Sequence, residues 1–205
     1  MSTIFRVHPD NPQPRSIKAA IENLKKGGLI IYPTSSGYAI GWSIENLKAP
    51  KVVAMIKEID AQHHYAMMCV SISQMTEFVL VDNVAFRLIK QHTPGPYTFI
   101  MEATRRVPKK LQQQKRKTIG IRIDEHPVVM ALLEELGEPM MTSTLEFPGI
   151  DMYELDVNDI EMKVGKLVSA IIYSGYCAQE PSTVVDLSNG EVDIIRQGKG
   201  VIDFV

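Results

Sequence analysis

Hydroxyl side chains that directly follow an apolar stretch are the first candidates for a small-molecule site. Thr34, Ser35 and Ser36 follow the apolar residues 29–32, and Tyr38 comes after Gly37. In open α/β sheets, ligands bind beyond strand ends, where hydroxyls donate hydrogen bonds and glycine lets the backbone approach closely. We interpret Thr34 and Tyr38 as contacts for an amino-acid-like ligand. The alternative is a tight turn that only ends a strand.

Three further polar positions lie beside turns or near strand ends. Thr98 follows Pro94-Gly95-Pro96, Ser143 lies between two threonines, and Arg196 precedes Gly198. Each has a purely structural alternative: a rigid connector, a β-branched strand with a local turn, and an exposed charge. Taken singly, none of them indicates a function.

Basic residues gather in one stretch, although the net charge of the chain is −2. No acidic residue interrupts residues 105–122, whose cations are Arg105, Arg106, Lys109, Lys110, Lys115, Arg116, Lys117 and Arg122. A local positive surface binds phosphates even on a slightly acidic protein. The alternative is a solvated basic loop that makes no contact with a partner.

Composition and missing motifs exclude several classes. The 205 residues are 45% hydrophobic and 22% charged, as in an ordinary globular protein, and no apolar run reaches the roughly 18 residues of a membrane span. Met1–Pro14 lacks the apolar core of a secretory signal, and two cysteines make no disulfide framework, so we expect a cytoplasmic protein without a membrane partner. Walker A, GxGxxG and metal-spaced Cys/His patterns are absent, so we assign no metal site and no catalytic residue.

Apolar periodicity alternates between helical and extended along the whole chain. Helical spacing covers 17–24, with Ser16 as the expected cap, and also 46–59, 129–136 and 158–167; Asp82 or Asn83 is expected to begin another helix. Extended stretches cover 29–32, 67–70, 97–101, 118–123, 140–145, 170–173, 183–186 and 192–196. This alternation predicts an α/β fold, and the absence of a linker or repeat favours one domain over 1–205.

The order of several short motifs resembles the YrdC/YciO family. The motifs are Pro33-Thr34-x-x-x-Tyr38-x-x-Gly41, Pro94-Gly95-Pro96-x-Thr98, Arg122 with His126-Pro127, Pro139 to Gly149, Pro181 to Asp186, and Ile195-Arg196-Gln197-Gly198. The stretches 8–13, 81–88 and 115–120 are most similar to the YciO branch. The resemblance covers roughly residues 14 to 200.

The resemblance implies a YrdC-like twisted mixed β-sheet with helices packed on it and a large positive concave groove. Family members make threonylcarbamoyl-AMP from threonine, bicarbonate and ATP for tRNA modification, and some have been described as binding double-stranded RNA and tRNA. Carried over by position, Thr34 and Tyr38 would contact the substrate, and ATP with Mg²⁺ would be a substrate rather than a tightly bound cofactor. The nucleotide-binding residues would be Lys57, Thr98, Arg122, Ser143 and Arg196.

Three departures from the synthase pattern stand out. Synthases carry Lys-x-Arg where this chain reads Lys57-Glu58-Ile59, so an arginine fork to phosphate is absent. They carry Ser-Ala-Asn where this chain reads Thr144-Leu145-Glu146, and often a histidine where Cys69 stands. These departures are typical of the YciO branch.

Two functions therefore remain open. The first is an ATP-binding nucleotidyltransferase of the L-threonylcarbamoyladenylate synthase type with low or altered activity. The second is a double-stranded RNA- or tRNA-binding protein without synthase activity. In the second, the contacts would come from Arg105, Arg106, Lys109, Lys110, Lys115, Arg116 and Lys117.

Overall fold

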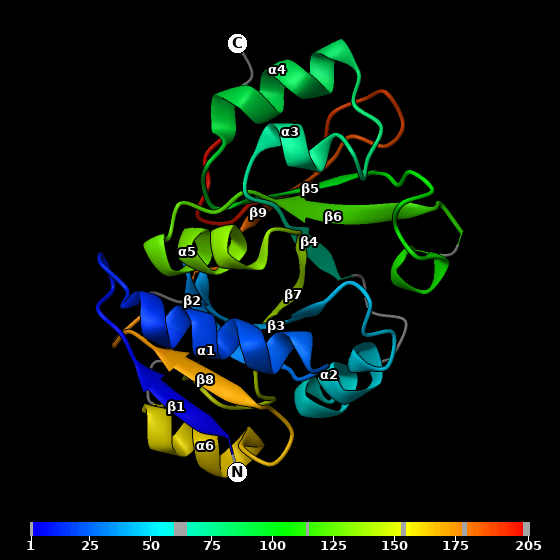
Figure 1. Cartoon of the computed structure of the whole chain (residues 1–205). Helices are drawn as coiled ribbons and strands as arrows, with labels where there is room; N and C mark the ends of the chain where they lie inside the picture. The colour runs from blue at the N-terminus through cyan, green and yellow to red at the C-terminus, as the bar shows by residue number, and fades with distance from the viewer. Residues whose placement is uncertain (1, 60–64, 114, 153–154, 178–179, 203–205) are drawn as a thin grey trace.

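Ten strands form one mixed sheet in the order β1-β8-β2-β3-β7-β4-β6-β5-β9-β10 (Figure 1). The computed structural model describes residues 2–59, 65–113, 115–152, 155–177 and 180–202. Its strands are β1 Thr3–Arg6, β2 Ile30–Thr34, β3 Gly37–Ser43, β4 Ala66–Met68, β5 Tyr97–Glu102, β6 Thr118–Arg122, β7 Met140–Thr144, β8 Ala170–Tyr173, β9 Thr183–Asp186 and β10 Asp193–Arg196. Its helices are α1 Pro14–Lys25, α2 Ala49–Lys57, α3 Ile72–Met75, α4 Asn83–His92, the short 3-10 helix η1 Lys109–Leu111, α5 Pro127–Leu136 and α6 Val157–Val164.

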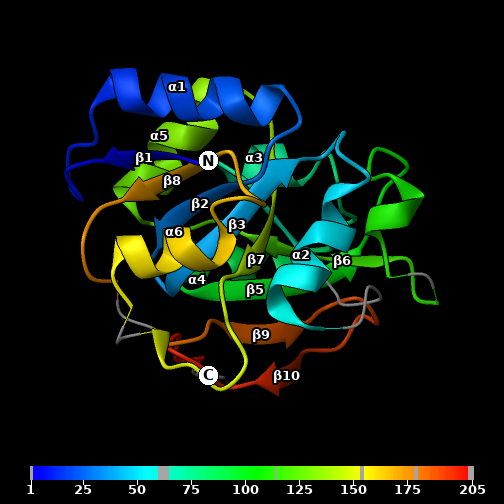
Figure 2. The same ribbon diagram turned by 90° about the horizontal axis from the view of Figure 1, so that it is seen from below.

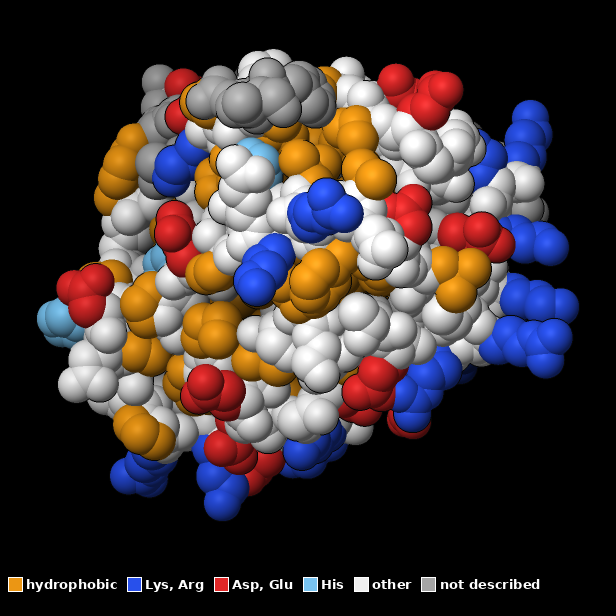
Figure 3. All heavy atoms as spheres, turned by 90° about the horizontal axis from the view of Figure 1, so that it is seen from above, with side chains coloured by type: hydrophobic (Ala, Val, Ile, Leu, Met, Phe, Trp, Pro, Cys, Tyr) orange, Lys and Arg blue, Asp and Glu red, His pale blue; other side chains and the backbone are white. Residues whose placement is uncertain are grey.

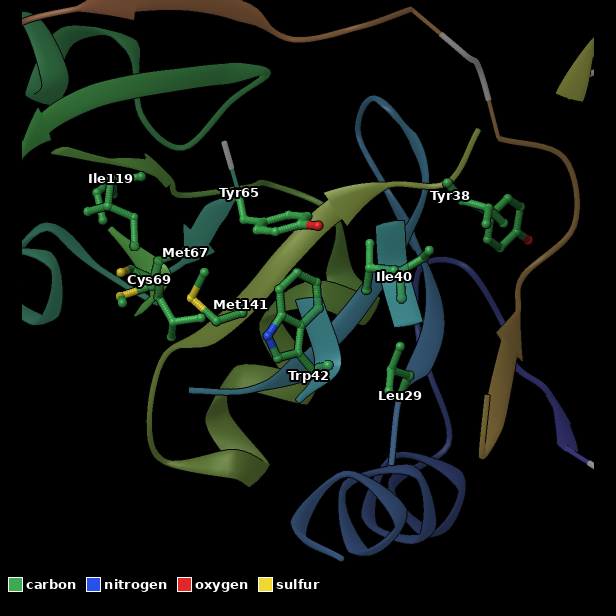
Figure 4. Packing of buried hydrophobic residues seen from close by; sticks show 14 of the residues in the cluster. Leu29, Tyr38, Ile40, Trp42, Tyr65, Met67, Cys69, Ile119 and Met141 are labelled. Atoms are coloured by element: carbon green, nitrogen blue, oxygen red, sulfur yellow. The ribbon is translucent and has the colours of Figure 1, made fainter. Parts of the chain in front are cut away.

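The sheet has two apolar faces because its central strands are buried on both sides. Along β3, Tyr38, Ile40 and Trp42 face the larger core, and Ala39 faces the smaller one. Figure 4 shows Ile40 and Trp42 with Met141 of β7 inside the larger core. Side chains that alternate between two cores fix the register of the strand, since a slip by one residue would exchange the two faces.

Helices α1 and α5 cover the smaller core and lie side by side in both ribbon views (Figures 1 and 2). Their buried residues follow helical spacing: Ile17, Ala20, Ile21 and Leu24 in α1, and Val128, Val129, Leu132, Leu133 and Leu136 in α5. Helix α2 contributes Val53 and Ile56 to the larger core, and Figure 2 shows β9 and β10 at the far edge of the sheet. Among the described residues, no helix combines the length and apolar character needed to cross a membrane.

The predicted α/β class and twisted mixed sheet are confirmed. The predicted strands 170–173 and 183–186 have the observed bounds, Asp82 caps α4, and Gly137 ends α5 with φ of 76°.

Three local features differ from what the sequence predicts. Helix α1 begins at Pro14 rather than after Ser16, because the fixed φ of proline suits the first turn of a helix. Strand β2 continues through Pro33, which lies beyond the residues that pair with β8, so its missing N–H breaks no bond on that side. Residues 37–41, for which the sequence left open a turn that only ends a strand, belong to β3.

Candidate functional site

The turn between β2 and β3, residues 34–36, is a hydrogen-bonded unit that we call the hydroxyl turn. Thr34 Oγ1 donates to the Gly37 carbonyl at 2.7 Å and accepts from the Ser36 amide at 3.1 Å. Gly37 has φ of 106°, a conformation in which a side chain would be strained. Thr34 and Ser36 are both buried. Because both hydrogen bonds of the Thr34 hydroxyl lie within the turn, this hydroxyl holds the turn in shape.

Asp124, two residues beyond the end of β6, anchors the hydroxyl turn. Its Oδ1 accepts from the backbone amides of Ser35 and His126, both at 3.0 Å, and its Oδ2 accepts from Ser35 Oγ at 2.8 Å. The side chain is completely buried. One carboxylate therefore joins the β2–β3 turn, the end of β6 and the start of α5.

Arg122 supplies the positive charge that balances this carboxylate. Its Nη2 lies 2.7 Å from Asp124 Oδ2 and donates to Ser36 Oγ at 3.1 Å. The guanidinium is buried, and its Nε has no hydrogen-bond partner among the described residues. Arg122 thus belongs to the frame of the hydroxyl turn and lies apart from the exposed basic residues 105–117.

His126 begins α5 from the same cluster. Its Nδ1 accepts from the Val128 amide at 3.2 Å, which requires that nitrogen to be unprotonated. Burial lowers the pKa of His126, and the nearby Asp124 carboxylate opposes that shift. The cap is accordingly present at neutral pH and lost as the pH falls through the lowered pKa.

Tyr38 connects the hydroxyl turn to the segment that follows β8. Its hydroxyl donates to the Gly175 carbonyl at 2.7 Å and accepts from the Ser174 amide at 3.2 Å, and its ring stacks on Tyr173. Figure 4 shows the ring directed toward that segment. Burial raises the pKa of the hydroxyl, so it acts as a neutral group.

A second cluster, which we call the lysine cluster, consists of Lys57, Ser143 and Glu146. Lys57 is the last residue of α2, and its Nζ lies 3.1 Å from Ser143 Oγ in β7 and 3.4 Å from Glu146 Oε2. Burial lowers the pKa of Lys57, Glu146 opposes that shift, and the positive charge of Arg196 adds to it. The predicted pair Lys57 and Ser143 therefore meets directly, with a carboxylate as third member.

A third cluster, the arginine cluster, brings Thr98 and Arg196 together through Ser182. Thr98 Oγ1 and Ser182 Oγ are 2.9 Å apart, and Arg196 donates through Nε and Nη2 to the Ser182 carbonyl at 3.2 and 2.9 Å. Three residues further on, Lys199 Nζ donates to the Ser35 carbonyl at 2.7 Å. The C-terminal segment thereby reaches the hydroxyl turn.

Sequence reasoning missed Asp124 and Lys199 as members of the site. Asp124 carried a readable signal, because it follows a predicted strand at a spacing of two from Arg122, and alternation places such residues on one side. Lys199 carried no local signal, since its contact with Ser35 spans 164 positions in the sequence.

The predicted RNA-binding cations lie between β5 and β6, and all of them are exposed. Arg106 pairs with Glu77 and packs over the Phe78 ring, and Arg116 pairs with Asp186 at 2.8 Å. Figure 3 shows basic side chains gathered along one edge of the molecule, on the side where the β5–β6 connection lies in Figure 1. For the other members of the set, the described part of the chain contains no ion pair.

A cavity of about 360 Å³ lies away from the three clusters and includes only Arg106 of the predicted residues. It is lined by Ile44, Glu45, Leu47, Phe78, Arg106, Pro108, Glu138 and Pro139. Among the residues that the structure describes, no three His, Cys, Asp or Glu side chains gather as metal ligands.

Comparison with known proteins places the chain in a family. The Sua5/YciO/YrdC family model, described as "Telomere recombination", matches residues 22–198. The YciO protein of Escherichia coli K12 is 46% identical over 98% of this chain and 97% of its own, and the crystal structure of E. coli YciO has a TM-score of 0.92 over 98% of both chains. A threonylcarbamoyl-AMP synthase of Vibrio vulnificus is 22% identical over 89% of this chain and 98% of its own.

The chain therefore belongs to the Sua5/YciO/YrdC family, as its motif order predicts. Its likeness to YciO extends over the whole length of both proteins. The P. abyssi Sua5 structure complexed with L-threonine has a TM-score of 0.82 at 21% identity, covers 96% of this chain and 58% of its own, and shows the shared fold.

We predict that Asp124→Ala destabilises the fold by roughly 3–5 kcal/mol, because it leaves the buried Arg122 guanidinium without a counter-charge. The adjacent Glu125→Ala, at an exposed position, should change stability by less than about 0.5 kcal/mol. Urea denaturation of both variants measures the difference. Equal midpoints for the two variants would contradict the role given to Asp124.

Proposed function

We propose that the chain binds ATP at the lysine and arginine clusters and an amino-acid-like substrate at the hydroxyl turn. The observation that carries the proposal is the convergence of three cations from distant elements on polar groups. Lys57 contacts the Ser143 hydroxyl, Arg196 contacts Ser182 and through it Thr98, and Lys199 contacts the Ser35 carbonyl. Arg196 and Lys199 are exposed and retain N–H groups beyond those already used, so they can donate to phosphate oxygens.

The family relatives indicate the reaction class. A related protein is named threonylcarbamoyl-AMP synthase, and P. abyssi Sua5 has been crystallised with L-threonine. By analogy, this chain would transfer an adenylyl group from ATP to a carboxylate or carbamate oxygen and release pyrophosphate. Such chemistry depends on positioning and on cations that stabilise the phosphates, with Mg²⁺ arriving on the nucleotide.

The phosphate contacts of this chain are fewer than the synthase pattern provides. Ile59 stands where a phosphate-binding arginine is expected, and Glu58 at the end of α2 adds a negative charge nearby. Arg122 is engaged with Asp124 and Ser36, which leaves it little freedom to bind a ligand. We therefore propose weak ATP binding and slow turnover.

A second candidate function is RNA binding through the β5–β6 connection. The observation that favours it is the group of exposed cations that make no ion pair within the described residues, among them Arg105, Lys109, Lys110 and Lys115. Contacts from such side chains to phosphates carry no sequence information, so binding would be broad across RNAs. This surface is distinct from the nucleotide site, and either function can stand without the other.

We predict that calorimetry detects weak binding of Mg²⁺-ATP, and that Arg196→Gln weakens it roughly 10- to 150-fold, the range for losing a charged hydrogen bond. Arg87→Gln, at an exposed position of α4, should have no effect and is the matched control. With threonine and bicarbonate present, pyrophosphate release should be slower than that of the V. vulnificus synthase assayed beside it. No heat with ATP, or equal loss in both variants, would refute the nucleotide site.

We predict that Ile59→Arg tightens ATP binding by about tenfold or more, because it adds a charge-assisted contact near Lys57. Ile59→Gln also introduces a polar side chain but no charge, and it should leave the affinity unchanged. The same calorimetric titration distinguishes them. If both variants bind ATP like the wild type, position 59 does not face the phosphates.

We predict that the triple variant Lys109→Gln, Lys110→Gln, Lys115→Gln binds double-stranded RNA more weakly and with a flatter salt dependence. Each lost phosphate contact should reduce the slope of log affinity against log salt by about 0.7–0.9. The control triple Lys18→Gln, Lys25→Gln, Lys26→Gln removes equal charge from exposed positions of α1 and its C-cap. Gel-shift titrations with double-stranded RNA and tRNA at two salt concentrations measure the affinity and its salt dependence for the wild type and both variants. If the wild type gives no shift at low salt, RNA binding is excluded.

A further inference from the structure

Lys57 and Glu146 form an ion pair whose two members differ sharply in exposure. The side chain of Lys57 is 5% exposed, and that of Glu146 is 59% exposed. A buried ammonium requires a counter-charge, which Glu146 supplies together with the Ser143 hydroxyl. An exposed carboxylate in such a pair keeps much of its hydration, so its hold on the lysine is weak and a stronger anion can replace it.

Any phosphate that reaches Lys57 meets this carboxylate. Lys57 is the last residue of α2, where the unpaired carbonyls of a helix carry partial negative charge and already favour the ammonium. Because Glu146 already contacts the ammonium of Lys57, a phosphate must displace Glu146 or share the lysine with it. In either case the repulsion grows with the number of negative charges on the ligand, because every phosphate adds a Coulombic interaction with the same carboxylate.

The other charged groups around Lys57 do not cancel this effect. Glu58 is exposed at the end of α2, and Arg196, whose charge acts on Lys57, is held by the Ser182 carbonyl in the arginine cluster. Asp124 is balanced by Arg122 within the frame of the hydroxyl turn. Among these groups, Glu146 is the carboxylate in ion-pair contact with the lysine.

We propose that Glu146 is a specificity-determining residue that makes the site select nucleotides by phosphate number, disfavouring triphosphates relative to monophosphates. This inference rests on the proposed nucleotide site and narrows its ligand class. The favoured ligands are adenylates, meaning AMP or an ester on its phosphate, which place less charge near Glu146 than ATP does. The carboxylate thus does more than neutralise a buried lysine.

The test compares ATP and AMP binding to the wild type, Glu146→Gln and the control Glu134→Gln, which alters an exposed glutamate of α5. Glu146→Gln should tighten ATP binding by about fivefold, because the carboxylate that it removes is exposed and largely hydrated, and AMP binding by less than about twofold. The gain should shrink at high salt, because exposed charges are screened. In a Lys57→Gln background, Glu146→Gln should still raise the ratio of ATP to AMP affinity, because the repulsion between the carboxylate and the phosphates does not require the lysine.

The outcomes separate this inference from the proposed function. If both nucleotides bind and Glu146→Gln leaves the ratio of ATP to AMP affinity unchanged, Glu146 is only a structural counter-charge and the inference fails alone. Thermal unfolding provides the complementary readout, because that structural role predicts a lower Tm with no change in ratio. If neither nucleotide binds to any variant, the proposed site and this inference fail together.

Discussion

The buried pair of Arg122 and Asp124 is the interaction on which the candidate site depends. Asp124 accepts hydrogen bonds from the turn after β2, from Arg122 and from the start of α5, and it is fully buried. Within the sheet, β2 and β6 are separated by β3, β7 and β4, so no ladder bond holds the turn against β6. A hydrogen-bonded carboxylate bridges that separation. Burying two charges is costly, and the cost is offset only when the remaining lone pairs are satisfied, as those of Asp124 are.

Charge balance gives the three clusters different characters. Around the hydroxyl turn the buried charges are paired with each other, which leaves a rigid frame of hydroxyls and backbone groups. Around Lys57 a buried cation is paired with an exposed carboxylate. In the arginine cluster, Arg196 binds a carbonyl and keeps its full charge. The three clusters of the candidate site therefore differ in how their charges are balanced.

Sequence reasoning predicted the helices and central strands well, because apolar spacing reflects burial on one or both faces. It missed β3, whose glycines and hydroxyl neighbours look like a turn although every residue of the strand is buried. It named Lys57 and Ser143 as members of one predicted nucleotide site, and the structure places these two side chains in contact. It did not show that Arg122 is neutralised by Asp124, because the partner of a charge depends on how distant elements pack. The contact of Lys199 with Ser35 could not be predicted from the sequence for the same reason.

The hydrogen bond between Lys199 and Ser35 has a consequence for synthesis of the protein on the ribosome. One side of the site is made early, at residues 34–36, and the other side 164 positions later. A growing chain can form α1 and the β2–β3 hairpin while Arg196 and Lys199 are still untranslated or inside the exit tunnel. Until these residues have left the ribosome, the nascent chain lacks the Arg196 guanidinium and the contact between Lys199 and Ser35. The proposed site is therefore complete only after residues 196–199 have been made.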